Sequence, residues 1–151
     1  MKYVAYGSNM NLEQMAVRCP TAELIGVGYL YGYKLYFDYH ADIFYTGNKQ
    51  DVIPVLLWEL KATDWKALDR YEGYPRYYIK EMVYVKYNNK KEKCIVYVMN
   101  HAEISFQLPS TTYLKTIAQG YRDNNIDLSY LMDAYKETLI NCMDDTEDDW
   151  R

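Results

Sequence analysis

The sequence predicts an α+β fold: a small mixed, partly closed β-barrel with a short inserted helix and C-terminal helices. Three observations predict it. Strand-like patterns dominate residues 21–99, a short helical pattern at 63–72 interrupts them, and helical spacing takes over after Pro109. A chain of 151 residues suits one domain. So many strands in so short a chain are expected to curl into a barrel.

The chain is expected to begin with a strand, a tight turn and a helix. Residues 2–5 form a short apolar run, YGSN follows at 6–9, and NLEQMAVRC at 11–19 has helical spacing. Asn11 is a suitable N-cap for that helix, and Pro20 is expected to stop it.

The middle of the chain is expected to consist mainly of strands. In residues 29–39 (YLYGYKLYFDY) the odd positions are aromatic or apolar, which is the period of a strand with one face in the core. Even positions, including Lys34 and Asp38, are expected to face water at least in part. Residues 52–60 (VIPVLLWEL) are typical of a strand buried on both faces, with Pro54 indicating a bulge or an edge.

A hairpin and two helices are expected to complete the fold. Residues 78–87 and 93–99 flank NNKKE, so we expect them to pair, with Asn88 and Asn89 in the turn. Ser110 is suited to cap the first of the two helices. The apolar stripes of these helices are Tyr113, Leu114, Ile117 and Tyr121 in one, and Leu128, Leu131, Tyr135, Leu139 and Cys142 in the other.

Charge separates one domain, residues 1–143, from an acidic tail, residues 144–151. The net charge is −4, and the tail (DDTEDDWR) accounts for it with five acids and one arginine. The remainder carries 16 basic and 16 acidic residues, so no basic surface for nucleic acid is expected. The tail itself is expected to be frayed and solvated.

Cysteines and histidines argue against disulfide and metal chemistry. The three cysteines, Cys19, Cys94 and Cys142, are odd in number and widely spaced, which is typical of reduced thiols in a cytosolic protein. Neither His40 nor His101 has a neighbour at metal-ligand spacing. The sequence shows no signal peptide and no apolar stretch of about 20 residues. We therefore expect a soluble, cytoplasmic protein without a bound metal.

Tyrosine is the unusual residue, with 19 copies. Its ring is apolar and its hydroxyl polar, so tyrosines can line a cavity that is partly dry and partly wet. They also favour strands, and a tyrosine-rich core and β-surface would explain the same composition.

Glu72 is the first candidate for catalysis. In the helix KATDWKALDRYEG (61–73), with Thr63 expected as N-cap and Gly73 as the residue that ends it, Glu72 falls on the same face as Trp65 and Leu68. Burial and the negative end of the helix dipole both disfavour its anion and raise its pKa. A carboxyl group of this kind suits general acid/base catalysis. Alternatively, Glu72 swings outward or pairs with Arg70, Arg76 or Lys80.

The YGSN loop is the second candidate. A glycine between a strand and a helix, followed by small polar residues, can expose several backbone N–H groups to an anion such as a substrate carboxylate or an oxyanion. An ordinary turn in which Asn9 or Asn11 caps the helix would give the same pattern.

Taken together, three motifs resemble the gamma-glutamylcyclotransferase-like family. They are VAYGSNMN (4–11), VLLWELKATDWKALDRYEGYPRYYIKEMVYV (55–85) and LPSTTYLKTIAQG (108–120), and their order and spacing hold along nearly the whole chain. PRYYIK (75–80) is more similar to the AIG2-like, gamma-glutamylamine cyclotransferase branch than to the glutathione-metabolism branch. Pro54 and residues 40–50 (HADIFYTGNKQ) depart from the family pattern and concern the outer wall of the pocket.

The resemblance implies a cofactor-independent enzyme with acyltransferase or lyase chemistry. It implies that Tyr6, Gly7, Ser8 and Asn9 hold the glutamyl group and that Glu72 is the acid/base. It also implies that Tyr78 and Tyr113 line the same cavity. In the family reaction, the α-amine of a γ-glutamyl group attacks its own γ-carbonyl, giving 5-oxoproline and a free amine or amino acid.

Other functions and several details stay open at this point. The same fold could serve as a non-catalytic binding module for a small amino-acid-like ligand, although a buried carboxylate would cost such a protein stability. A thiol enzyme is disfavoured because no cysteine has a histidine nearby in sequence. The expected partner is a small γ-glutamyl molecule, and the protein is expected to be a monomer or a homodimer. The leaving amine is not encoded in any pattern that we identify.

Overall fold

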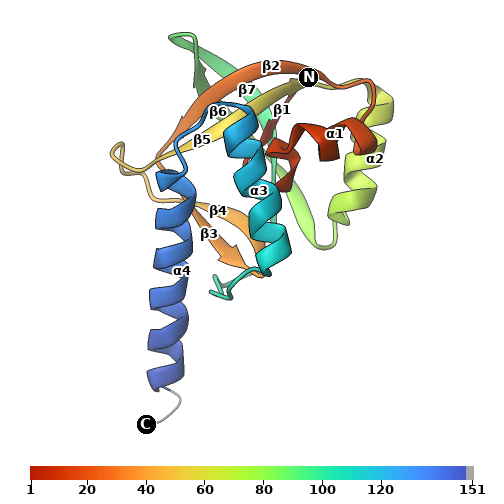
Figure 1. Ribbon diagram of the computed structural model, residues 1–151. Helices are drawn as coiled ribbons and strands as arrows, with labels where there is room; N and C mark the ends of the chain where they lie inside the picture. The colour runs from red at the N-terminus through yellow and green to blue at the C-terminus, as the bar shows by residue number, and fades with distance from the viewer. Residues whose placement is uncertain (149–151) are drawn as a thin grey trace.

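A computed structural model describes residues 1–148 and contains a closed five-stranded β-barrel (Figure 1). The strands follow one another in the order β1–β5–β2–β6–β7, and parallel pairing of β1 with β7 closes the ring. Strands β3 and β4 form a separate two-stranded sheet. The predicted α+β class and mixed barrel are confirmed, and the closure is complete rather than partial.

In chain order the elements are β1 (Lys2–Ala5), the 3₁₀ helix η1 (Ser8–Met10), α1 (Leu12–Arg18), β2 (Glu23–Tyr31), β3 (Tyr33–Asp38), β4 (His40–Tyr45), β5 (Val52–Glu59), α2 (Ala62–Glu72), β6 (Tyr78–Tyr87), β7 (Lys90–Met99), α3 (Thr111–Asp123) and α4 (Ser129–Asp148).

Strand β5 is the buried strand that its apolar sequence predicts. It lies between β1 and β2, and its residues 53–58 are all buried. Pro54 pairs with Tyr29 of β2, whereas β1 reaches only as far along β5 as Leu56. Pro54 therefore lies where β5 has one strand neighbour, so its missing N–H interrupts no ladder on the other side.

The alternating run 29–39 is not one strand with one buried face, and this prediction is wrong. Strand β2 ends in the barrel at Tyr31, and β3 begins in the small sheet at Tyr33. The even-numbered Leu30 and Tyr36 are buried, while the odd-numbered Tyr31 is exposed. The turn at residue 32 moves the chain from one sheet to the other, and this changes which face is covered.

The predicted hairpin forms from β6 and β7. Asn88 and Asn89 have φ values of 49° and 61°, as a two-residue type I′ turn requires. Strand β7 begins at Lys90, three residues before the predicted start at 93, because pairing with β6 continues to Tyr87 and Lys90 beside the turn.

Two of the three predicted helix caps are correct. The Asn11 side chain accepts a hydrogen bond from the Gln14 N–H at 2.9 Å, and the Ser110 hydroxyl accepts one from the Tyr113 N–H at 3.1 Å. Thr63, however, lies inside α2. Helix α2 instead begins after Lys61, whose N–H donates to the Asp64 carboxylate at 2.9 Å.

Helix α3 packs directly on the turn that follows β1. A Cβ atom placed on Gly120 would lie 2.5 Å from the carbonyl carbon of Met10 and 2.7 Å from the nitrogen of Asn11. These are backbone atoms that cannot rotate away. Glycine at this position therefore allows α3 to approach and support η1.

Helix α4 packs against β3 and extends beyond the barrel (Figure 1). Its buried positions are Leu131, Ala134 and Thr138, and the Thr138 hydroxyl accepts a hydrogen bond from the Phe37 N–H at 3.1 Å. The backbone of residues 144–148, predicted as part of the acidic tail, continues this helix. Residues 149–151 lie outside the described residues.

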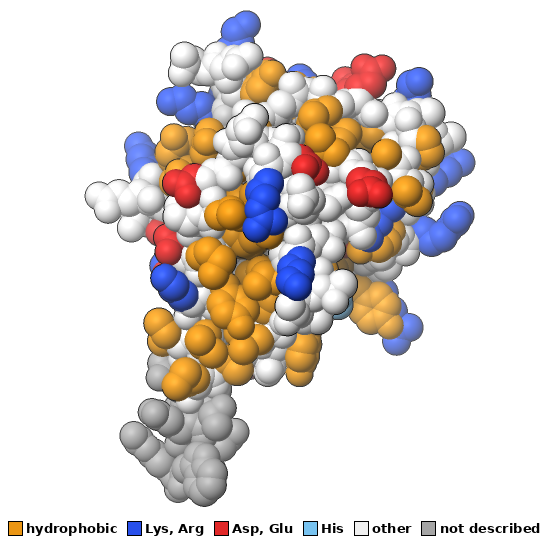
Figure 2. All heavy atoms as spheres, viewed as in Figure 1, with side chains coloured by type: hydrophobic (Ala, Val, Ile, Leu, Met, Phe, Trp, Pro, Cys, Tyr) orange, Lys and Arg blue, Asp and Glu red, His pale blue; other side chains and the backbone are white. Residues whose placement is uncertain are grey.

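Hydrophobic side chains gather over the lower half of the face shown in Figure 2. Helix α4 contributes exposed Met132, Ile140 and Met143 to the surface of the molecule. Exposed apolar surface of this kind is common at protein–protein contacts, so the choice between monomer and homodimer stays a prediction. None of the helices in residues 1–148 is long and apolar enough to cross a membrane.

Candidate active site

A cavity of about 690 Å³ opens between the turn after β1, the end of α2, and strands β4, β6 and β7. The seven residues singled out from the sequence, Tyr6, Gly7, Ser8, Asn9, Glu72, Tyr78 and Tyr113, all line it. They come from four separate parts of the chain. The structure therefore brings the predicted residues together, while their individual roles stay predictions.

Glu72 occupies the last turn of α2, where the helical pattern places it on the inner face. Leu68, one turn earlier, is fully buried, and Trp65 packs against the core. The Glu72 side chain is half-buried and forms neither a hydrogen bond nor an ion pair within residues 1–148. Burial raises the pKa of its carboxyl group to about 7, and the charge of Arg18 opposes this increase. Glu72 therefore exists in both protonation states near neutral pH.

Gly73 ends α2 and lines the cavity. Its φ of 64° is left-handed, and the Tyr74 N–H bonds back to the Asp69 carbonyl at 2.9 Å. Lys80, which could have paired with Glu72, instead forms an ion pair with Asp69, with Lys80 Nζ 2.8 Å from the Asp69 carboxylate. The Glu72 carboxylate is thus left unpaired at a helix end that already disfavours an anion.

The side chains of the YGSN loop are held by protein groups. The Ser8 hydroxyl and the Asn9 side-chain oxygen both accept hydrogen bonds from Arg18. The Asn9 amide donates to the Tyr3 hydroxyl at 2.9 Å, and the Tyr6 hydroxyl donates to the Tyr97 carbonyl at 2.6 Å.

With the Tyr6 hydroxyl donating to Tyr97 and the Asn9 amide to Tyr3, this loop can offer a ligand its backbone N–H groups and the proton of the Ser8 hydroxyl, which has no acceptor among residues 1–148. The first N–H groups of a helix have no partner within that helix, and η1 begins at Ser8. A Cβ on Gly7 would approach the Tyr113 hydroxyl to 3.3 Å and Ala41 Cβ to 3.2 Å. Gly7 thus keeps this part of the cavity open.

Tyr78 and Tyr113 are both fastened to one residue, Ala41 of β4. The Tyr78 hydroxyl donates to the Ala41 carbonyl at 3.0 Å, whereas the Tyr113 hydroxyl accepts from the Ala41 N–H at 3.0 Å. The proton of Tyr78 is therefore engaged. The proton of Tyr113 has no acceptor among residues 1–148, so it can be donated to a bound molecule.

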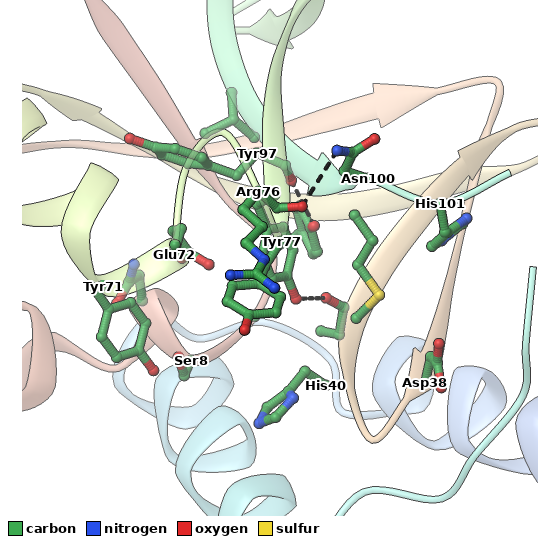
Figure 3. Close-up of a pocket in the computed structure, with 18 of the residues that line it drawn as sticks. Ser8, Asp38, His40, Tyr71, Glu72, Arg76, Tyr77, Tyr97, Asn100 and His101 are labelled. Atoms are coloured by element: carbon green, nitrogen blue, oxygen red, sulfur yellow. Dashed lines mark hydrogen bonds between the residues drawn. The ribbon is translucent and has the colours of Figure 1, made fainter.

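Several residues of the cavity were not identified from the sequence. Figure 3 shows Glu72, Tyr71 and Ser8 on one side of the view, Asp38 and His101 on the other, and His40 between them. The Nε2 atom of His101 lies 3.0 Å from the Oδ2 atom of the buried Asp42. The ring centroids of His40 and Tyr113 are 5.1 Å apart. Asp38 and His40 lie at the junction of β3 and β4, in or next to the segment that departs from the family pattern. No local signal in the sequence distinguishes them.

The described part of the chain contains no group of three or more His, Cys, Asp or Glu side chains that could hold a metal ion. Cys19 and Cys94 are buried, do not line the cavity, and have thiol pKa values that burial raises to about 11. Both are therefore protonated thiols at neutral pH, which makes them poor nucleophiles.

Comparison with known proteins agrees with this geometry. Residues 3–120 match the family model described as "Gamma-glutamyl cyclotransferase, AIG2-like". Over 142 residues the chain is 29% identical to a gamma-glutamylcyclotransferase of Homo sapiens and 30% identical to one of Bos taurus, covering 85% of this chain and 73% of each relative. A solved structure of a gamma-glutamyl cyclotransferase is similar with a TM-score of 0.77 and 27% identity, covering 89% of this chain and 85% of that one. The chain therefore belongs to the AIG2-like gamma-glutamyl cyclotransferase family of enzymes.

Proposed function

We propose that this protein is a γ-glutamyl cyclotransferase that converts a γ-glutamyl amine or γ-glutamyl amino acid into 5-oxoproline and the free amine or amino acid. One observation carries the proposal. The unpaired carboxyl group of Glu72, with a pKa of about 7, lines the same cavity as the turn at residues 7–9.

The turn is suited to hold the α-carboxylate of the γ-glutamyl group. Arg18 and Tyr3 hold its side chains in place, and the backbone N–H groups at the start of η1 and the proton of the Ser8 hydroxyl are left for an anion. A carboxylate bound there places the rest of the glutamyl chain in the cavity that Glu72 shares.

Glu72 is suited to move the protons of the reaction. The α-ammonium group first releases one proton to solvent, and the neutral α-amine then attacks the γ-carbonyl carbon. As the ring bond forms, the Glu72 carboxylate accepts a second proton from the α-nitrogen. As a carboxylic acid it returns the proton to the leaving nitrogen, and the original amide bond breaks. A group that titrates near the working pH performs both steps efficiently and contributes roughly 10²–10⁴ in rate.

The remaining catalytic effect comes from geometry. Attacking and leaving groups belong to one molecule, so the cavity has to hold the glutamyl chain in a bent conformation. The Tyr113 hydroxyl, with its proton free, is a suitable donor to the oxygen on which negative charge develops.

The test is to replace Glu72 by Gln and to measure 5-oxoproline release from a panel of γ-glutamyl amines and amino acids. We expect kcat to fall by at least about 100-fold, because the amide cannot exchange protons with the substrate. Glu81→Gln is the matched control, since Glu81 is an exposed residue of β6 outside the cavity.

Near-normal turnover by Glu72→Gln would contradict the role of Glu72. If the unaltered protein binds γ-glutamyl molecules and returns them intact after long incubation, it is a binding module. The panel also identifies the leaving amine and distinguishes the gamma-glutamylamine branch from enzymes that release amino acids.

A further inference from the structure

We propose that Arg18 is a positioning residue of this site: its guanidinium group fixes the YGSN loop against the end of α2 and sets the charge that Glu72 faces. The proposal rests on the proposed function. Arg18 is the last residue of α1, and it is not among the residues that line the cavity. It therefore acts on the cavity through the residues that it contacts.

The N–H groups of the guanidinium group hold the YGSN loop. Arg18 Nη1 donates to the Ser8 hydroxyl at 3.2 Å and also to the side-chain oxygen of Asn9. With the Gln14 amide turned so that both of its groups are satisfied, its oxygen accepts from Arg18 Nη2 at 2.7 Å and its nitrogen donates to the Ser8 carbonyl at 3.1 Å. Two consecutive residues of the loop are thus tied to α1.

The guanidinium group also contacts the end of α2. The Cζ atom of Arg18 lies 3.4 Å from the centroid of the Tyr71 ring, a close cation–π contact. Tyr71 directly precedes Glu72 in the same helical turn. One planar group therefore fixes the spacing between the loop that would hold the substrate and the proposed acid/base, a task for which the planar fork of arginine is suited.

Arg18 also supplies charge. It forms no ion pair with any carboxylate within residues 1–148, so its positive charge is not neutralised by a direct partner. Its charge lowers the pKa of Glu72 and opposes the effect of burial.

Several other titratable or charged groups surround Glu72. The tyrosines that face Glu72 from β1, the turn after it, β6, β7 and α3 all have pKa values raised by burial, so they are neutral at neutral pH: Tyr3, Tyr6, Tyr78, Tyr97 and Tyr113. Arg70, Arg76 and His40 line the same cavity. The charge of Arg18 lowers the pKa of the Glu72 carboxyl group.

The experiment uses two substitutions that separate geometry from charge. Arg18→Met removes both the fork and the charge. Arg18→Lys keeps a positive charge but replaces the planar fork by a single ammonium group. Arg122→Met is the control, because Arg122 is exposed on α3 and outside the cavity. Circular dichroism establishes that each variant is folded.

Two quantities are measured for each protein. The first is the titration midpoint of the Glu72 carboxyl carbon by ¹³C NMR, with the signal assigned by its loss in Glu72→Gln. The second is the pair of kinetic constants for 5-oxoproline release from the best γ-glutamyl substrate. The NMR midpoint reads the effect of Arg18 even if no substrate is turned over, so failure of the proposed function and failure of this proposal are distinguishable.

For Arg18→Met we expect a Glu72 midpoint at higher pH, and a fall in kcat/KM of roughly tenfold or more because the loop loosens. For Arg18→Lys we expect a midpoint close to that of the unaltered protein, together with a raised KM. An unchanged midpoint in Arg18→Met would overturn the electrostatic role. An unchanged KM in Arg18→Lys would overturn the positioning role, and this second variant decides the matter if Arg18→Met does not fold.

Discussion

Glu72 is expected to make the folded protein less stable at the pH where it is most useful. Its carboxyl pKa is about 7 in the folded protein, against an ordinary value of 4.5 that applies to the unfolded chain. The folded protein therefore binds the Glu72 proton more tightly than the unfolded chain does. Consequently the folded state carries no penalty from this group below pH 4.5, and stability falls as the pH rises from 4.5 through 7.

The size of the effect follows from that difference. Each pH unit by which a pKa differs between folded and unfolded protein corresponds to about 1.4 kcal/mol, so the ionised Glu72 costs on the order of 3 kcal/mol. A typical domain is stable by only about 5–15 kcal/mol. Replacing Glu72 by Gln, which is neutral at every pH, should therefore stabilise the protein at pH 8 by up to about 3 kcal/mol.

Urea denaturation at pH 5 and pH 8 measures this prediction. We expect Glu72→Gln to differ from the unaltered protein by less than about 1 kcal/mol at pH 5 and by about 3 kcal/mol at pH 8. Glu81→Gln, at an exposed position, should show no comparable pH dependence. A gain in stability that is the same at both pH values would refute the reasoning, because an effect of packing does not follow the titration of a carboxyl group.

Two further predictions concern residues that support the site. Tyr113→Phe should lower kcat/KM by roughly 10- to 100-fold because it removes a free hydrogen-bond donor. The Tyr78 hydroxyl already donates its proton to Ala41, so Tyr78→Phe should mainly lower stability, by about 1 kcal/mol. Steady-state kinetics and urea denaturation test both variants, and equal losses of kcat/KM would contradict the distinction. Gly120→Ala should destabilise the protein by about 1–3 kcal/mol and raise KM, because the added Cβ would press against the backbone of Met10. Thermal unfolding checks this, and an unchanged melting temperature would show that α3 can move away freely.

Short-range patterns in the sequence predict the local structure around the site. Helical spacing placed Glu72 on the same face as Leu68, and Gly73 marked the end of the helix; both features are present in the structure. The caps Asn11 and Ser110 are predictable because each side chain accepts a hydrogen bond from the N–H three residues ahead, which is a local feature. Resemblance to a family then placed the YGSN loop, Glu72, Tyr78 and Tyr113 at one site, and all of them line one cavity.

Which segments meet depends on long-range contacts that the sequence patterns do not contain. The contacts of Ala41 with Tyr78 and Tyr113 span 37 and 72 positions of the chain, and Arg18 reaches both the YGSN loop and Tyr71. A hydrophobic pattern states which residues are buried but not against which partner. For the same reason the alternating run 29–39 looked like one strand, although a turn divides it between two sheets. The wall of the cavity and the position of Arg18 near Glu72 result from long-range packing, which local periodicity does not predict.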